Sequence, residues 1–272
     1  MRGCQLTSLR EESKLAATMT LICTLITNAG IVQSSDSNLT SASGAAGPGK
    51  KVFRLDFGDG ALAVAGSYAV GGHSMEAWMP DCITTYSATT APTVAGFSEY
   101  LRTRLSTEML EHEWKRGCLI HVAGYTAGGG GTHAELWFVR NVERIDEQTG
   151  AYVGPSAQFL LSEDFWNRDY LSPTTKAVFQ SGGYQRYFNG FPPGRIAFFG
   201  LSNMLQSFFN QVWGHPSWKF RPPQSLDELA SFVELEIRAI GTMFGSSNYP
   251  APYIGGDVQI EVIAPPPGAV TL

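Results

Sequence analysis

Four residues in the first quarter of the chain carry groups that together could cleave an amide bond: Thr20, Asp36, Lys51 and Gly66. A threonine hydroxyl is a weak nucleophile until a base removes its proton, and a free α-amine, with a pKa of about 7.7–8.0, suits that task near neutral pH. An adjacent lysine ammonium lowers the pKa of that amine, and an aspartate holds the lysine in place. A glycine N–H can stabilise the tetrahedral oxyanion by about 2.7–4 kcal/mol. The set predicts nucleophilic acyl transfer through Thr20.

A first predicted β-hairpin brings the hydroxyl and the carboxylate together. Residues 20–27 and 31–36 are β-branched and apolar runs on either side of the turn signal Asn28-Ala29-Gly30. Antiparallel pairing about this turn places Asp36 within about two residues of Thr20 across the ladder.

A second predicted hairpin supplies the lysine. Residues 51–57 and 61–67 flank the turn Gly58-Asp59-Gly60. Pairing about this turn sets Lys51 nearly opposite Ser67, so the open ends of both hairpins meet at one edge.

The rest of the chain alternates helical and strand patterns without a repeat. Helices are expected over 94–109, 196–213 and from Ser225 to Ile240, the last of which opens with a capping box formed by Ser225 and Glu228. Strands are expected over 118–125, 133–142 and 258–262, a Gly/Ala/Ser loop over 39–50, and a loop-rich insertion over 143–193. Strands with two apolar faces between helical segments suit two stacked sheets covered by helices. The sequence therefore predicts an α+β fold in one domain.

Composition excludes several classes of protein. The 272 residues are 43% hydrophobic and only 16% charged, which is too apolar for a disordered chain. The net charge of −5 gives no basic footprint for nucleic acid. No uncharged apolar run reaches the length of a membrane span. Four scattered cysteines without a CxxC pair fit a reducing compartment, so we expect a cytoplasmic protein.

Other patterns predict no cofactor and no metal. The glycines at 128–131 join two predicted strands and lack the GK[ST] of a phosphate-binding loop. His121 and His133 are candidate neighbours across a hairpin, but a third ligand is missing.

The stretch from Thr20 to Ser67 resembles the N-terminal part of proteasome β-type subunits, which are N-terminal-nucleophile (Ntn) hydrolases. In that family the mature chain opens with Thr, an Asp-Ser pair follows 16 residues later, and a lysine segment and a glycine-rich turn come next. The matching segments here are Asp36-Ser37, Lys50-Lys51-Val52 with the lysine one residue early, Ala65-Gly66-Ser67 and, near the end, Tyr253-Ile254-Gly255-Gly256 in place of Tyr-Ser-Gly-Gly.

The resemblance implies a four-layer αββα sandwich over residues 20–265, with two mainly antiparallel sheets between helical layers and a tail at 266–272. It implies that Thr40 faces the substrate and that Ser67 lies in the substrate-binding turn beside the catalytic set. The implied activity is hydrolysis of peptide bonds by a threonine-type peptidase. The implied partners are a peptide or protein substrate, further copies of the chain in a homo-oligomeric ring, and an ATPase.

The sequence departs from the family pattern at two late positions. Ala251 stands where the family keeps a second Asp, and Ile254 stands where it has Ser. Asn248 and Asp257 are the candidate substitutes. Two alternatives therefore stay open: a catalytically inactive proteasome-like subunit with an assembly role, and an Ntn amidase acting on small amides.

The first nineteen residues decide whether the Thr20 amine is available. Residues 1–19 mix charges of both signs and lack strand alternation, so we expect an extension, a propeptide or a mis-assigned start. Met19 precedes Thr20 where self-processing members carry Gly. We expect the functional chain to begin at Thr20, through initiation at Met19 or through cleavage.

Overall fold

A computed structural model describes eight segments of the chain: residues 20–41, 44–128, 131–145, 152–163, 184–190, 192–213, 223–247 and 254–269. The expected extension at 1–19 lies outside the described residues, as does the end of the expected tail.

A four-stranded antiparallel sheet contains the first hairpin. Its strands, in spatial order, are β14 (Tyr184–Gly190), β1 (Leu21–Thr27), β2 (Gly30–Asp36) and β15 (Val258–Ile263). Every residue of β1 and β2 is buried, which agrees with the apolar and β-branched character of both of their faces. The last strand, β15, thus pairs with β2 and completes the sheet that the first hairpin begins.

A five-stranded antiparallel sheet contains the second hairpin. Its order is β13 (Leu160–Glu163), β10 (Gly131–Arg140), β9 (Cys118–Gly128), β6 (Ala61–Gly66) and β5 (Val52–Arg54). Three two-stranded ribbons complete the strands: β3 (Asn38–Ser41) with β4 (Gly44–Pro48), β7 (Ala69–Val70) with β8 (His73–Ser74), and β11 (Arg144–Ile145) with β12 (Tyr152–Val153).

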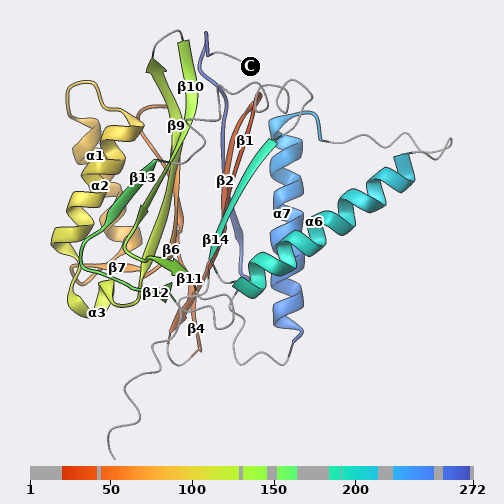
Figure 1. Cartoon of the computed structure of the whole chain (residues 1–272), viewed down its shortest axis with the longest axis horizontal. Coiled ribbons are helices and arrows are strands. Elements are labelled where there is room, and N and C mark those ends of the chain that lie inside the picture. Colours follow the sequence, from red (N-terminus) through yellow and green to blue (C-terminus); the bar gives the residue numbers. More distant parts are fainter. Residues whose placement is uncertain are drawn as a thin grey trace, which may run out of the picture.

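Helices lie on the outer side of each sheet, and the two sheets face each other (Figure 1). Beside the five-stranded sheet are α1 (Met75–Ser87), α2 (Val94–Glu108) and the single turn α3 (Glu111–Trp114), and beside the four-stranded sheet are α6 (Pro192–Trp213) and α7 (Leu226–Gly245). The predicted α+β class with antiparallel sheets is confirmed.

The register of the second hairpin differs from the predicted register by three residues. Val52 pairs with Ala63, so Lys51 lies across from Val64 and not across from Ser67. The strands stop at Arg54 and Ala61 because the connection is a six-residue loop rather than the three-residue turn that the glycines suggested.

Two further expectations differ from the structure. The segment expected to be a loop at 39–50 contains β3 and β4, because its small residues permit a short ribbon with a bulge at Leu39/Thr40. The expected insertion at 143–193 contributes β13 and β14, each of which forms one edge of its sheet. An edge strand has one unpaired side and tolerates polar residues, so its sequence lacks clean periodicity. Helix α1, which includes Pro80, was not expected.

The N-terminus of α7 forms as the sequence indicated. The Ser225 hydroxyl accepts a hydrogen bond from the Glu228 N–H at 3.2 Å. The Glu228 carboxylate accepts the N–H of Gln224 at 2.8 Å, one residue before the position that a capping box predicts.

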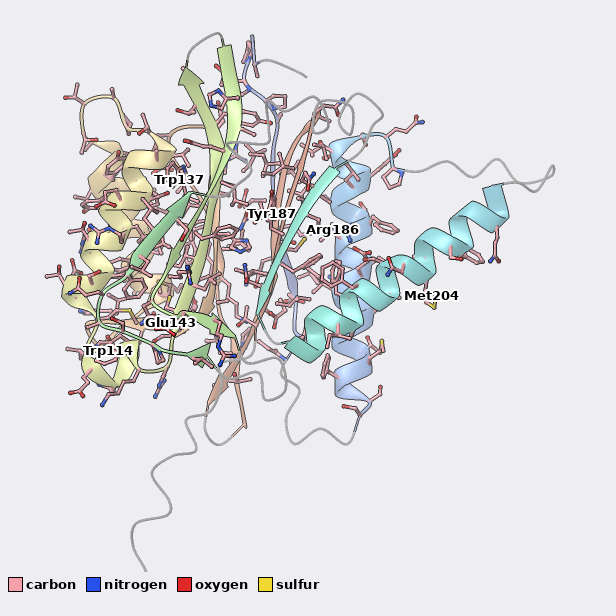
Figure 2. The ribbon with its side chains drawn as sticks, in the orientation of Figure 1. Trp114, Trp137, Glu143, Arg186, Tyr187 and Met204 are labelled. Atoms are coloured by element: carbon pink, nitrogen blue, oxygen red, sulfur yellow. The ribbon has the colours of Figure 1, made fainter. Side chains whose placement is uncertain are left out.

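A largely buried arginine connects the two outer helices α6 and α7 to the four-stranded sheet. Arg186 of β14 contacts Ser202 of α6 (2.9 Å) and Glu236 of α7 (3.3 Å). Figure 2 shows Arg186 directed to the helices, while the next residue, Tyr187, is directed to the other sheet. Burial raises the pKa of Glu236, and the Arg186 charge opposes that shift.

A polar cluster links the facing sheets. His121 of β9 lies 2.8 Å by its Nδ1 from the Thr24 hydroxyl and 2.6 Å by its Nε2 from the Asn189 amide. Thr24 donates its only proton to Gln33 Oε1, so His121 donates from Nδ1 and accepts at Nε2, as a neutral ring. Burial lowers the pKa of His121 to about 3.

The neutral state of His121 predicts a dependence of stability on pH. Below pH 6.5 the unfolded chain gains a proton at this residue that the folded chain does not, so stability is lost as pH falls. His121 alone should lower the free energy of unfolding by about 1.2 kcal/mol between pH 6 and pH 5. Urea unfolding at the two pH values should show this loss in wild type and in the exposed control His73→Gln, but not in His121→Gln. An imidazole signal of His121 that titrates near pH 6.5 in NMR spectra would contradict the prediction.

Candidate active site

The structure brings Thr20, Asp36 and Lys51 together below a small cavity. Lys51 Nζ lies 2.9 Å from Thr20 Oγ1 and 3.3 Å from Asp36 Oδ1, and it also donates to the carbonyl oxygen of Asn38. These three acceptors match the three protons of an ammonium group. The Thr20 hydroxyl oxygen therefore accepts a charge-assisted hydrogen bond, which leaves its own proton available to a base.

The first hairpin positions the carboxylate. Ile22 pairs with Ser35, so Asp36 follows directly beside Leu21. Its Oδ1 accepts the Leu21 N–H at 2.9 Å, and its Oδ2 accepts the Gly255 N–H at 3.3 Å. Asp36 is fully buried, and these two hydrogen bonds fix its orientation towards Lys51.

A glutamine from the last strand positions the lysine. Gln259 of β15 accepts the N–H groups of Lys51 (2.7 Å) and Val52 (3.1 Å) at its Oε1, and donates from Nε2 to the Gly49 carbonyl (2.7 Å). The Lys51 carbonyl accepts the Val64 N–H at 3.0 Å. Lys51 is thus held between both sheets, although it lies just before β5.

Burial and charge act in opposite directions on the pair. Lys51 is 1% exposed, and its burial lowers the pKa of the ammonium, while the Asp36 charge raises it. Burial likewise raises the pKa of Asp36, and the Lys51 charge lowers it. Each group keeps its charge only because the other is present.

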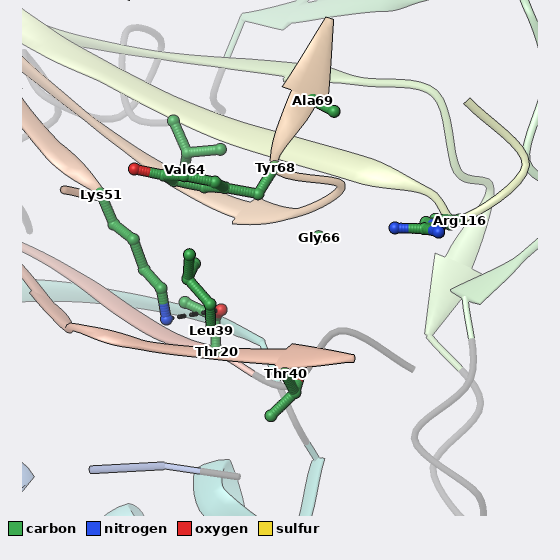
Figure 3. A pocket seen from close by; sticks show the side chains of 9 residues that line it. All are labelled: Thr20, Leu39, Thr40, Lys51, Val64, Gly66, Tyr68, Ala69 and Arg116. Atoms are coloured by element: carbon green, nitrogen blue, oxygen red, sulfur yellow. Dashed lines mark hydrogen bonds between the residues drawn. The ribbon is translucent and has the colours of Figure 1, made fainter. Parts of the chain in front are cut away.

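The cavity above Thr20 has a volume of about 130 Å³ (Figure 3). Its lining residues are Thr20, Leu39, Thr40, Lys51, Val64, Gly66, Tyr68, Ala69 and Arg116. Lys51 lies on one side of the cavity in this view, Arg116 on the other, and Gly66 between them. The cavity is thus lined by a hydroxyl, two cations and a glycine backbone.

Two glycines allow the backbone to approach closely at this site. Gly66 has a φ of +97°, and a Cβ there would lie 2.4 Å from the Gly117 carbonyl oxygen. Gly190 has a φ of +128°, and a Cβ there would lie 1.7 Å from the carbonyl oxygen of Thr20. Both positions require glycine on conformational and steric grounds.

The remaining predicted residues have different surroundings. Thr40 lines the cavity with Thr20 and Gly66. Ser67 is fully buried and is not among the lining residues, and its N–H donates to the Gly117 carbonyl at 2.7 Å. Ile254 is fully buried in the apolar cluster that includes the inner face of α7. Asp257 is exposed, and positions 251 and 248 lie outside the described residues.

Sequence reasoning missed several residues of the site. Gln259 and Arg116 are 208 and 65 residues from Lys51, and only sheet pairing brings them near it. Gly255, whose N–H donates to Asp36, belongs to the segment Tyr253-Ile254-Gly255-Gly256 that resembles the family. The sequence therefore offered a reason to expect this segment near the site.

Metal ligands do not gather in the part of the chain that the structure describes: it contains no group of three or more His, Cys, Asp or Glu side chains that could hold an ion. The sequence made His121 and His133 candidate neighbours across a hairpin. In the structure His121 pairs with Phe138 and His133 pairs with Thr126, so the two histidines are not opposite each other. Nor is any helix in the described segments long and apolar enough to cross a membrane.

Comparison with protein-family models and with curated proteins finds no match to this chain. The geometry of the site therefore carries the functional argument.

The buried pair predicts a strong dependence of stability on Lys51. Lys51→Met leaves the Asp36 carboxylate buried without its counter-charge, which should lower the free energy of unfolding by about 3–5 kcal/mol. Lys115→Met is the control, because Lys115 is half exposed and pairs with Glu111 on the surface, and its loss should leave the free energy of unfolding nearly unchanged. Urea unfolding at one chain concentration measures both. Equal midpoints for Lys51→Met and wild type would show that the pair is not coupled to folding.

Proposed function

We propose that this protein is a threonine-type peptidase of the proteasome-like N-terminal-nucleophile kind, which hydrolyses peptide bonds through Thr20. The observation that carries the proposal is the 2.9 Å contact between the Lys51 ammonium and the Thr20 hydroxyl, at a cavity, with Asp36 buried behind the lysine. A threonine that only packs in a sheet needs no ammonium at its hydroxyl, and burying the Lys51–Asp36 pair costs desolvation energy that an apolar pair would not. The position of this pair at a hydroxyl that lines a cavity supports a chemical role.

The proposed mechanism needs a free α-amine on Thr20. That amine takes the hydroxyl proton while Oγ1 attacks the carbonyl carbon of the substrate, and Lys51 stabilises the charge that develops on Oγ1. The Gly66 N–H donates to the oxyanion of the tetrahedral intermediate. The C–N bond then breaks as the leaving amine takes the proton back, and a water molecule hydrolyses the resulting ester by the same route in reverse.

The arrangement of layers supports the proposal. Two facing antiparallel sheets with helices on both outer sides agree with the four-layer αββα sandwich that the resemblance implies. In this arrangement the open ends of both hairpins lie at the cavity, where the family carries its nucleophile. The three cysteines in the described segments are buried free thiols, in line with the proposed cytoplasmic location.

The first test asks whether the native chain begins at Thr20 and whether the Thr20 hydroxyl reacts as a nucleophile. Native protein should have the mass of a chain that begins at Thr20, since the amine of an internal residue is locked in an amide. Incubation with a peptide epoxyketone should add one inhibitor to each chain, as measured by intact mass spectrometry. Thr20→Ala should remain unmodified, and the control Thr107→Ala, which changes an exposed hydroxyl on α2, should react like wild type.

Each other outcome has a definite meaning. A chain that begins at Thr20 and stays unmodified while folded would favour the inactive assembly subunit. A chain that retains residues 1–19 after incubation has no base and contradicts the mechanism. Faster hydrolysis of small amides than of peptides would favour the amidase.

The proposed assembly is a homo-oligomeric ring that works with an ATPase. It is supported by α6, where no charged residue occurs after Arg195. Among the side chains of this helix that the structure describes, the large exposed apolar ones are Ile196, Phe199, Met204 and Phe208, at 65%, 48%, 60% and 51% exposure. Figure 2 shows Met204 directed away from the sheets. A helix that is apolar on its outer face as well is expected to be covered.

Self-association should depend on this face of α6. Native mass spectrometry should show assemblies larger than one chain, and Phe208→Glu should shift the distribution towards the monomer, because a buried unpaired carboxylate is unfavourable. Leu160→Glu is the matched control, since Leu160 is also 51% exposed but lies on β13. A wild-type protein that is monomeric at micromolar concentration would overturn the proposed ring.

A further inference from the structure

We propose that Arg116 selects the substrate of this site, and that the preferred substrate is a peptide with an acidic side chain on the residue whose carbonyl carbon Thr20 attacks. This inference rests on the proposed function for its catalytic part, but recognition of the carboxylate can be measured separately.

Arg116 reaches the cavity through the pairing of β6 with β9. Gly66 pairs with Cys118, so the residues just before β9 lie beside Gly66. Arg116 lines the cavity together with Thr20 and Gly66, and Figure 3 shows its guanidinium opposite Lys51. Consider a substrate whose carbonyl carbon lies at the Thr20 hydroxyl and whose oxyanion lies at the Gly66 N–H. The side chain of the residue that carries this carbonyl would then point towards Arg116.

The nearby carboxylates are already committed to other groups. Glu113 is 2% exposed, and its two oxygens accept the N–H groups of Leu110, Gly71 and Gly72 at 2.8–2.9 Å. Glu111 pairs with Lys115 at 2.6 Å. Within the described residues, no carboxylate pairs with the Arg116 guanidinium.

The other cation and the only phenol of the cavity lining are also committed. Lys51 directs its three protons to Thr20, Asp36 and Asn38. Tyr68 donates its hydroxyl to the Lys50 carbonyl at 2.7 Å. Arg116 is therefore the lining cation with donors to spare, and the lining contains no carboxylate that would repel an acidic ligand.

The shape and polarity of the cavity fit one acidic side chain. Its volume of about 130 Å³ is well below the roughly 300–1,000 Å³ of pockets that enclose whole small molecules. Leu39, Val64 and Ala69 supply apolar walls for the methylene groups of a glutamate. A guanidinium at the far side can bind the two carboxylate oxygens with parallel hydrogen bonds.

Binding is measured first, with Thr20→Ala prepared with the N-terminus found for the wild-type protein. The probes are the blocked tripeptides acetyl-Ala-Ala-Glu-amide and acetyl-Ala-Ala-Gln-amide, which differ only in charge. The Glu peptide should bind about 10-fold more tightly in NMR titrations, the scale of a hydrogen bond to a charged group. Adding Arg116→Gln should abolish this preference, while Arg116→Lys should keep part of it.

The control is Lys115→Gln, which removes the same charge from the adjacent, exposed residue that does not line the cavity. This variant should leave the ratio of the two peptide affinities unchanged. The comparison therefore distinguishes a direct contact between Arg116 and the carboxylate from long-range electrostatic attraction. Equal binding of the two peptides, or a preference that survives Arg116→Gln, would overturn the inference.

The catalytic arm distinguishes this inference from the proposed function. The wild-type protein should cleave a fluorogenic substrate after Glu with about 10-fold higher kcat/KM than after Gln, and Arg116→Gln should equalise the two values. If neither substrate is cleaved while the binding preference persists, the peptidase proposal fails and carboxylate recognition stands. If both are cleaved equally, the peptidase proposal stands and the role of Arg116 fails.

Discussion

The structure depends on one constraint, which is that Lys51 and Asp36 are charged and almost completely buried. Apart from the small part of Lys51 that lines the cavity, neither side chain is exposed to solvent, so the protein must supply their hydrogen-bond partners. The ammonium has three acceptors, and the carboxylate has the ammonium and two backbone N–H groups. The Thr20 hydroxyl is one of those acceptors, so the arrangement that stabilises the buried pair also polarises the hydroxyl that we propose as the nucleophile.

The groups that satisfy this pair come from distant parts of the chain. Leu21 belongs to the first strand, Lys51 precedes β5, and Gly255 and Gln259 come from the last described segment. The site therefore forms only when the four-stranded sheet is complete and the five-stranded sheet packs against it. The His121 cluster has the same requirement, because its partners Thr24 and Asn189 lie on two strands of the opposite sheet. Stacking of the sheets is thus specified by polar groups as well as by apolar ones.

The cavity combines a protected centre with an open rim. Thr20 is 4% exposed and Lys51 1%, whereas Arg116 at the other side is exposed to solvent. A charge at the rim interacts weakly until a ligand excludes water from it, and the interaction then strengthens. We propose that the buried Lys51 polarises the nucleophile and that the exposed Arg116 selects the substrate.

The sequence by itself determined the local elements and part of the site. The β-branched and apolar runs in residues 20–36 and their turn glycine were sufficient to predict the first hairpin and the proximity of Asp36 to Thr20, and the capping pattern at Ser225 predicted α7. These features depend on neighbours along the chain. Tertiary structure decided the rest. The register of the second hairpin, and with it the place of Lys51, depended on a loop whose length the glycines alone did not reveal. The role of Gln259 and the arrival of Arg116 at Gly66 depended on pairing between strands far apart in sequence. Such contacts leave no periodic signal, because they are selected by the packing of two complete sheets and not by the residues beside them.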